Sequence, residues 1–379
     1  MASVVKTNIK LSPVKTQAEF LDLGHGEGER VPPRLTSHSP PSSDAIDLRQ
    51  YHPDFLHVVG TESCYSLLLS SDDSSRNPLF RNGCVYAPLT DELFIMSGLL
   101  QSTNSSTLPT ILISQVSFQR GSESTAENNI CAVEWKKLRP PQGMTMPAGA
   151  CRYKDGILYC SQGTLVPDTG GLWYMPYRMA PISVLSSYFG KPFNSIQNVV
   201  QDKDGGAWFT DASNGFEQGI RPKPKLPNQV YRVDASGRNV RAVADGFGRP
   251  GGIALSPDHS ILYVSDTDAS RPDGTMDPTR AATIYAFDIK VWSGSHFLTN
   301  KRVFAYATGG VPTAMVCDGN GNVYAACGDG VEVWNSGGVA LGLIEVLGGC
   351  TTLSFGRTEE ELFIGSGQRL WMFRMHTDM

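Results

Sequence analysis

The stretch that decides the fold reads PGGIALSPDHSILYVSDT from Pro250: a short apolar strand, a turn and a second apolar strand. The turn residues Ser, Pro, Asp and His favour a tight reversal between two strands. The same phrase recurs with variations five more times, as GCVYAPLTDELFIMSG from Gly83, ACRYKDGILYCSQG from Ala150, IQNVVQDKDGGAWFTDA from Ile196, PTAMVCDGNGNVYAACGD from Pro312 and CTTLSFGRTEEELFIGSG from Cys350. A phrase repeated along the whole chain indicates a repeat architecture.

A further strand follows each phrase, and the interval of 39 to 65 residues between successive second strands fits a four-stranded unit. These following strands are LPTILISQV from Leu108, GGLWYMPY from Gly170, NQVYRVD from Asn228, ATIYAFDI from Ala282, GVEVWN from Gly330 and RLWMFRM from Arg369. Continuous apolar strands such as ILYV indicate burial of both faces. We therefore predict an all-β, six-bladed β-propeller with four-stranded blades around a central channel. Two stacked β-sandwiches would not produce a six-fold phrase.

The region before the first phrase has a different composition. From about Gly24 to Asp47 the chain is rich in Pro, Ser and Gly and has no periodicity, which is typical of a loop or flexible segment. We therefore expect residues 1–50 to form an N-terminal arm that is partly flexible, and residues 51–379 to form a single propeller domain. A segment near Phe55–Leu69 should supply the outer strand that closes the ring.

Charge and cysteine content exclude several classes of function. The net charge of −5 and the pI near 5.8 give no reason to expect nucleic acid or an anionic membrane as a partner. The chain has no apolar run long enough to span a bilayer and no apolar signal core near its start, so we expect a cytoplasmic protein. The eight cysteines are scattered without a CxxC pair, which favours free thiols over a zinc site.

Two long stretches carry a family resemblance: FNSIQNVVQDKDGGAWFTDASNGFEQGIRPKPKLPNQVYRVD (193–234) and ADGFGRPGGIALSPDHSILYVSDT (244–267). They resemble the SMP-30/gluconolactonase/strictosidine-synthase-like superfamily of six-bladed propellers, and its fungal gluconolactonase-like members in particular. The resemblance covers about Leu79 to Met375. It implies a lactonase whose divalent metal, usually calcium, lies on the channel axis. The family ligands are a Glu from an EGP-like phrase, an Asn from PND, an Asn from RPNG and an Asp from PDG.

This chain keeps the phrases and changes the ligands. The Glu position holds Asn82, the PND-like phrase reads SIQN with Gln197 and Asn198, RPNG reads RPGG with Gly251, and PDG reads PTA with Thr313. A hard cation needs oxygen ligands, with carboxylates supplying the charge. Because both carboxylates are absent, we predict no metal at this point and no other cofactor.

Four charged residues near the channel have two interpretations each. Asp211 and Asp266 end strands, where they could accept hydrogen bonds from a substrate or cap the adjoining turn through backbone N–H groups. Glu217 could face the pocket or belong to a surface loop. Arg221 lies in the Pro-stiffened segment IRPKPKLP, which could reach over the channel mouth or remain solvated. We predict these four as substrate-binding residues, together with the neutral residues Asn198 and Gly251.

The remaining candidates, Asn82, Gln197 and Thr313, offer neutral donors and acceptors and no general base. Such groups suit the positioning and polarisation of a reactive intermediate. Fungal relatives of this propeller include metal-free hetero-Diels–Alderases that join a tropolone-derived o-quinone methide to a sesquiterpene alkene. The resemblance thus implies a metal-independent cyclisation or cycloaddition in fungal secondary metabolism, with hydrophobic, reactive small molecules as substrates. The alternatives are a lactone or ester hydrolase with a relocated site, and a non-catalytic small-molecule binder.

Overall fold

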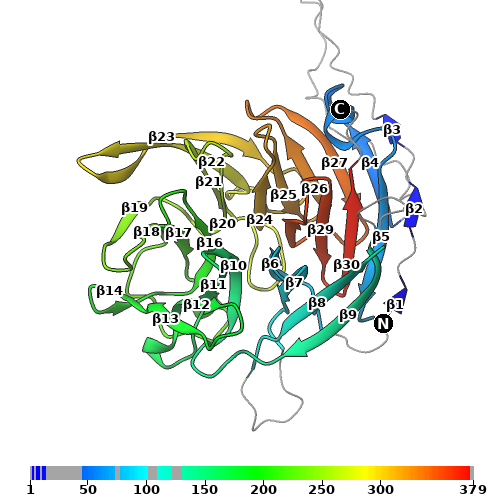
Figure 1. The fold of residues 1–379 in the computed structure, drawn as a ribbon. Helices are drawn as coiled ribbons and strands as arrows, with labels where there is room; N and C mark the ends of the chain where they lie inside the picture. Colours follow the sequence, from blue (N-terminus) through cyan, green and yellow to red (C-terminus); the bar gives the residue numbers. More distant parts are fainter. Residues whose placement is uncertain are drawn as a thin grey trace, which may run out of the picture.

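The computed structural model describes residues 2–3, 6–8, 11–13, 45–72, 77–100, 109–121 and 130–375. Within these ranges the strands form six blades arranged in a ring (Figure 1). Each blade is an antiparallel meander whose first strand faces the channel, and the first strands of neighbouring blades contact one another around the whole ring. The predicted all-β, six-bladed propeller is therefore confirmed.

The strands of the blades follow the order of the chain. Blades 1 to 3 contain β6 (Asn82–Ala87), β7 (Glu92–Met96), β8 (Ile113–Arg120) and β9 (Ile130–Leu138); β10 (Pro147–Tyr153), β11 (Gly156–Ser161), β12 (Gly171–Pro176) and β13 (Ile182–Leu185); and β16 (Ile196–Gln201), β17 (Ala207–Asp211), β18 (Gln229–Val233) and β19 (Val240–Ala244). Blades 4 to 6 contain β20 (Pro250–Leu255), β21 (Ile261–Asp266), β22 (Thr283–Trp292) and β23 (Ser295–Tyr306); β24 (Ala314–Cys317), β25 (Val323–Cys327), β26 (Gly330–Trp334) and β27 (Ala340–Val346); and β28 (Thr352–Phe355), β29 (Glu361–Ser366), β30 (Arg369–Arg374) and the N-terminal β5 (Cys64–Ser70).

Strand β5 closes the ring. It pairs antiparallel with β30 and so supplies the fourth strand of blade 6 from the N-terminal side of the chain. The sequence predicted this closing strand near Phe55–Leu69, and the structure places the strand in the second half of that segment. The first half forms the short helix α1 (Phe55–Val59), whose Phe55 and Val59 side chains are buried. Because β5 precedes blade 1 in the chain, its pairing in blade 6 joins the two ends of the ring.

The residues before β5 extend the outer edges of three adjacent blades. Strand β4 (Ile46–Gln50) pairs with β27 of blade 5, and β3 (Leu11–Pro13) pairs in parallel with β4. Strand β2 (Lys6–Asn8) pairs with β5 of blade 6, and β1 (Ala2–Ser3) pairs with β9 of blade 1. Most of the Pro/Ser/Gly-rich stretch, residues 24–44, lies outside the described residues. The boundary at residue 50 and the flexibility of the arm stay predictions.

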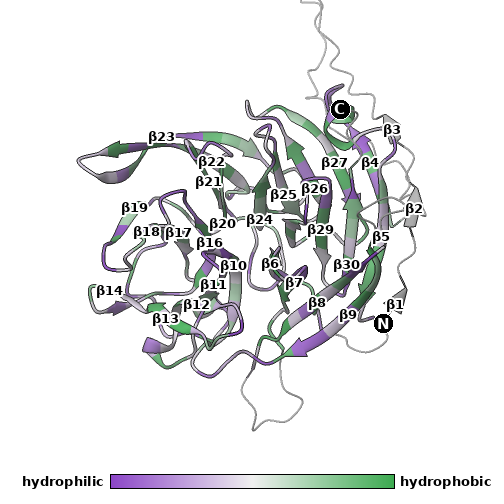
Figure 2. Cartoon of the chain, viewed as in Figure 1, coloured by the Kyte–Doolittle hydropathy of each residue, from purple (hydrophilic) through white to green (hydrophobic). Residues whose placement is uncertain are grey.

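The core lies between neighbouring blades. All residues of β17, β25 and β29 are buried, as the continuous apolar runs predicted. Trp208 shows the pattern: its ring is fully buried between blades 3 and 4, and its indole N–H donates to Asp202 over 2.9 Å. Burial of such a side chain contributes roughly 2–3 kcal/mol. Figure 2 shows hydrophobic residues along the inner and middle strands and more hydrophilic ones on outer strands such as β9.

In the part of the chain that the structure describes, helical structure is confined to short connections. Besides α1, the described residues contain the four-residue helix α2 (Asn214–Glu217) and the 3-10 turn η1 (Pro167–Thr169). A small hairpin of β14 (Ser187–Tyr188) and β15 (Lys191–Pro192) links blades 2 and 3. No helix in the described part of the chain is long and apolar enough to cross a membrane.

A buried carboxyl group in blade 5 makes stability depend on pH. Burial raises the pKa of Asp329 from 3.8 to about 7, and the charge of Glu332 adds to this effect. The Oδ1 atom of Asp329 is buried and has no hydrogen-bond partner among the described residues. The folded chain therefore keeps a proton that the unfolded chain loses above about pH 4. We expect the free energy of unfolding to fall as the pH rises from about 4 to about 7. Urea denaturation at several pH values should show a smaller decrease in the free energy of unfolding with pH for Asp329→Asn than for the wild type. An equal decrease in both proteins would contradict this.

Candidate functional site

A cavity of about 310 Å³ lies at the end of the channel where the six inner strands begin. Residues at the starts of all six strands line it, and the loops after β17 and β21 form part of its wall. Six of the nine site residues predicted from the sequence line this cavity: Asn82, Gln197, Asn198, Glu217, Gly251 and Thr313. The repeated phrases therefore converge on one place, as the family resemblance implies.

A β-bulge at the start of the inner strand recurs in blades 1 to 4. The pairing register with the second strand shifts between Asn82 and Val85, and in the same way at the starts of β10, β16 and β20. A bulge inserts an extra residue, bends the strand and re-aims its side chains. The candidate positions Gln197, Asn198 and Gly251 lie within these bulges. The bulges thus explain why these phrases point toward the channel axis.

Two of the three predicted catalytic residues direct amide hydrogens into the protein. Nδ2 of Asn82 donates to the carbonyl oxygen of Ser97 at 3.1 Å. Nε2 of Gln197 lies 2.9 Å from the Ser195 carbonyl, 3.0 Å from the Ser195 hydroxyl and 3.3 Å from Oε1 of Gln162. Since these contacts use its amide nitrogen, Gln197 offers the cavity its carbonyl oxygen. Of the donor and acceptor groups that the sequence predicted at this position, the acceptor is the one left for a ligand.

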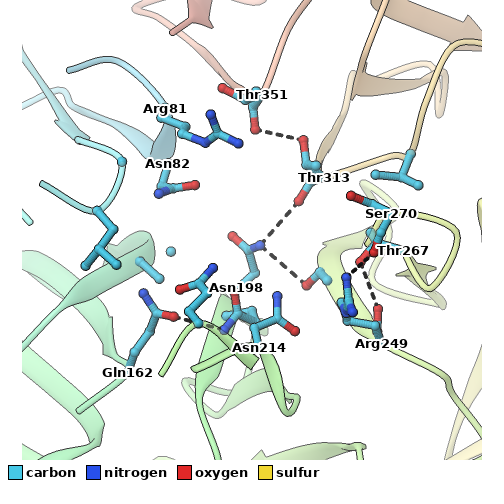
Figure 3. Close-up of a pocket in the computed structure, with 18 of the residues that line it drawn as sticks. Arg81, Asn82, Gln162, Asn198, Asn214, Arg249, Thr267, Ser270, Thr313 and Thr351 are labelled. Carbon is cyan, nitrogen blue, oxygen red and sulfur yellow. Dashed lines mark hydrogen bonds between the residues drawn. The ribbon is translucent and has the colours of Figure 1, made fainter. Parts of the chain in front are cut away.

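The third predicted catalytic residue, Thr313, also directs its hydrogen-bond donor into the protein. Its hydroxyl lies 2.8 Å from the Thr351 carbonyl and 3.1 Å from the Ala326 carbonyl. The neighbouring Asn198 places Nδ2 at 3.4 Å from the carbonyl oxygens of both Gly251 and Thr313 (Figure 3). These contacts join blades 3, 4 and 5 across the channel. Asn198 therefore holds inner strands together where the sequence suggested a substrate contact.

Asp211 and Asp266 do not line the cavity. Asp211 is fully buried and accepts hydrogen bonds from the backbone N–H groups of Asn194 and Ser195 at 2.9 and 2.7 Å. Asp266 accepts in the same way from two backbone N–H groups just before β20. Burial raises the pKa of Asp211 to about 7, against the lowering effect of those N–H groups and of the Arg221 charge. The turn-capping alternative describes both residues, and neither is placed to touch a substrate.

Arg221 neither reaches over the channel mouth nor is solvated. Arg221 is 2 % exposed, and burial lowers the pKa of its guanidinium. The guanidinium donates to five backbone carbonyls, those of Thr164, Val166, Pro167, Phe193 and Asn194. Arg221 therefore ties the loop after β11 to the entry of β16, which corrects its assignment as a substrate-binding residue.

Glu217 is the carboxylate that remains at the cavity. Among the described residues that line it, Glu217 alone carries a carboxyl group. Its side chain is 29 % exposed; Oε2 accepts from Nη2 of Arg249 at 2.5 Å, and Oε1 accepts from the Ser213 hydroxyl at 3.1 Å. Arg249 also donates from Nη1 to the Ser270 carbonyl, while its Nε–H is buried without a partner among the described residues. The pair thus presents a fixed carboxylate beside a fixed guanidinium.

The cationic side chains of the cavity were not identified from the sequence. Arg81 and Arg249 each lie next to a recognised phrase, in RNGCVY and GRPGG, but the sequence does not show which way they point. Figure 3 shows the Arg81 side chain extending from beside Asn82 into the cavity. Gln162 and Asn214 also line it, and no pattern in the sequence indicated them. The site is therefore more polar and more cationic than predicted.

The divalent cation that the family resemblance implies does not fit these residues. In the part of the chain that the structure describes, no three His, Cys, Asp or Glu side chains come together as a ligand group. The cavity carboxylate of Glu217 is already paired with Arg249, and Arg81 adds a positive charge. Gly251 has no side chain, and a Cβ there would lie 2.9 Å from Cγ2 of Thr267. This donor set supplies no uncompensated carboxylate for a hard cation.

Comparison with known proteins places the chain in a family. The model described as "SMP-30/Gluconolactonase/LRE-like region" matches residues 136–368, more than half of the chain. A gluconolactonase of Zymomonas mobilis is 28% identical over 257 residues, covering 62% of this chain and 68% of that protein. Lactonohydrolase oryL of Aspergillus oryzae is 27% identical over 333 residues, covering 82% and 70%. The fold matches the structure of a Xanthomonas campestris gluconolactonase with a TM-score of 0.65 at 22% identity, covering 87% and 95%.

The chain therefore belongs to the SMP-30/gluconolactonase-like family. The match begins at residue 136, so blade 1, which carries Arg81 and Asn82, lies almost entirely outside it. The named relatives are lactone-hydrolysing enzymes, and they support the hydrolase alternative better than the cyclisation predicted from the sequence. Nothing in these relatives supports a Diels–Alderase.

Proposed function

We propose that this protein is a lactone or ester hydrolase whose reaction centre is the pair Glu217–Arg249 and not an axial metal ion. The observation that carries the proposal is the pair itself: a carboxylate on the cavity wall, held by an arginine that a second contact, to the Ser270 carbonyl, fixes in place. Family membership supplies the reaction class. The pair supplies a base and a donor that the altered metal positions do not.

Lactone hydrolysis needs a water molecule that loses a proton as its oxygen attacks the carbonyl carbon. Glu217 is positioned to take that proton, because Arg249 and Ser213 fix its carboxylate from two sides. As the ring C–O bond breaks, the proton passes from Glu217 to the departing alkoxide oxygen. The product is a single hydroxy acid, whose carboxyl group then ionises. Each step uses groups of this chain alone.

The developing negative charge on the carbonyl oxygen needs a donor that is already in place. The guanidinium of Arg249 meets this requirement, because its contacts to Glu217 and to the Ser270 carbonyl hold it in place and each of these two nitrogens carries a second N–H. A fixed donor aimed at an oxyanion contributes about 3–4 kcal/mol. Asn82, with an amide hydrogen beyond its contact to Ser97, offers a further donor from blade 1, across the cavity from Arg249.

A pH-stat assay over a panel of neutral and acidic lactones tests the proposal, since each turnover releases one acid group. We expect hydrolysis above the spontaneous rate for at least one polar lactone, because polar side chains dominate the cavity wall. A panel without enzymatic hydrolysis would reject the hydrolase. Raised thermal stability with the same lactones would then indicate a binder.

Cyclisation by positioning alone is the second candidate. It is favoured by one observation: the family's axial ligand positions carry no carboxylate, and Asn198 instead bridges two backbone carbonyls there. Such an enzyme would leave every lactone intact. It would change the product ratio of an o-quinone methide reacting with an alkene, which chromatography of the products measures.

A further inference from the structure

Arg81 lies directly before β6 with its backbone fixed and its side chain supported. The backbone N–H donates to the Met96 carbonyl at 3.0 Å. The side-chain stem runs past Gly98, where a Cβ would lie 3.1 Å from Cδ of Arg81. The residue is exposed, and its guanidinium extends into the cavity (Figure 3). This support orients the guanidinium without using its N–H groups.

Arg81 differs from the other arginines of the cavity in that it has no counter-ion among the described residues. Arg249 is paired with Glu217, and the Arg271 side chain is paired with Asp277. No described residue forms a hydrogen bond or an ion pair with the Arg81 guanidinium. With the other two arginines neutralised, Arg81 gives the cavity an uncompensated positive charge.

The form of this charge favours one kind of ligand group. A guanidinium presents a planar fork of N–H donors that matches the two oxygens of a carboxylate. Gln197 lines the same cavity, and its amide nitrogen is engaged by Ser195 and Gln162. Its carbonyl oxygen therefore fits a hydroxyl donor on the ligand. Together, the two groups match a hydroxylated acid.

We propose that Arg81 is a specificity-determining residue that binds a carboxylate carried by the substrate, so that the preferred substrates are acidic lactones. The identification of the substrate as a lactone rests on the proposed function; binding of the carboxylate does not. The carboxylate on Arg81 is separate from the lactone carbonyl at the Glu217–Arg249 pair. Arg81 therefore selects the substrate and takes no part in proton transfer.

A matched pair of substrates tests the selection: the γ-lactone of 2-hydroxyglutaric acid, with its free carboxylate, and the methyl ester of that carboxylate. The wild-type protein should show a kcat/KM for the acid about 10–100-fold above that for the ester, the range expected for a charged hydrogen-bonded pair. Arg81→Gln should remove this preference, and Arg81→Lys should leave part of it. Arg152→Gln, which removes a guanidinium outside the cavity, should keep it.

Calorimetric binding of 2-hydroxyglutarate separates this inference from the hydrolase proposal. We expect Arg81→Gln to weaken binding about 10–100-fold, while the melting temperature shows that the variant is folded. Arg81-dependent binding without hydrolysis of any lactone would reject the hydrolase and support the Arg81 site. Equal affinity in the wild type and Arg81→Gln, or equal kcat/KM for acid and ester in the wild type, would overturn the inference.

Discussion

Replacing Glu217 by Gln is expected to lower kcat for lactone hydrolysis by about 10²–10⁴-fold, the usual contribution of a general base. The substitution keeps the size of the side chain and its contact with the Ser213 hydroxyl, and it removes the group that accepts the proton from water. KM should change little, because the proposed substrate carboxylate binds elsewhere. Steady-state kinetics in the pH-stat assay measure both parameters.

The control for this variant is a matched ion pair outside the cavity. Glu345 pairs with Arg49 at 2.5 Å on blade 5 and does not line the cavity, so Glu345→Gln should leave kcat within about twofold of the wild type. Loss of a partly exposed pair costs little stability, about 0–1 kcal/mol. A folded Glu217→Gln variant that hydrolyses lactones at the wild-type rate would exclude Glu217 as the base.

Glu361→Ala should be the most destabilising of the substitutions considered, lowering the free energy of unfolding by about 3–5 kcal/mol. Glu361 is fully buried at the start of β29 in blade 6. Its carboxylate accepts hydrogen bonds from Arg120 of blade 1 at 2.6 and 3.1 Å and from Arg374 of β30 at 3.0 Å. Removal of the carboxylate deprives two buried guanidinium groups of this acceptor at the junction where the ring closes.

Urea denaturation followed by fluorescence measures this effect. The matched control is Glu134→Gln, because Glu134 pairs with Lys136 at 3.1 Å and both side chains are about half exposed. That pair should contribute less than about 1 kcal/mol. If Glu361→Ala unfolds at the same urea concentration as Glu134→Gln, the network does not stabilise the closure of the ring.

The sequence predicted the architecture because the information needed is local and repeated. Each blade phrase carries its own turn residues and a second strand that is buried on both faces, and strands such as β17 and β29 are buried throughout. The closing strand was also predictable, since one blade lacked a fourth strand after β30. The additions of β1, β2 and β3 to outer edges were not, because two- and three-residue pairings leave no periodicity in the sequence.

The site was predicted in position and only partly in chemistry. The phrases placed Asn82, Gln197 and Thr313 at the channel mouth, but their donor hydrogens are directed mostly to backbone and side-chain acceptors of the protein. Arg221 was predicted to bind substrate from a Pro-stiffened loop and is instead buried, where its guanidinium joins two loops. Such outcomes depend on hydrogen bonds between distant segments, which composition and spacing do not encode. The orientation of Arg81 and Arg249 depends on the same long-range geometry.

The measurement that tests the account most directly is lactone hydrolysis by protein whose metal content has been determined, before and after treatment with EDTA. The account predicts far less than one divalent ion per chain and a hydrolysis rate that the chelator leaves within about twofold, because Glu217 and Arg249 carry the reaction. One bound divalent ion per chain, together with loss of hydrolysis in EDTA and its recovery on adding calcium, would contradict it.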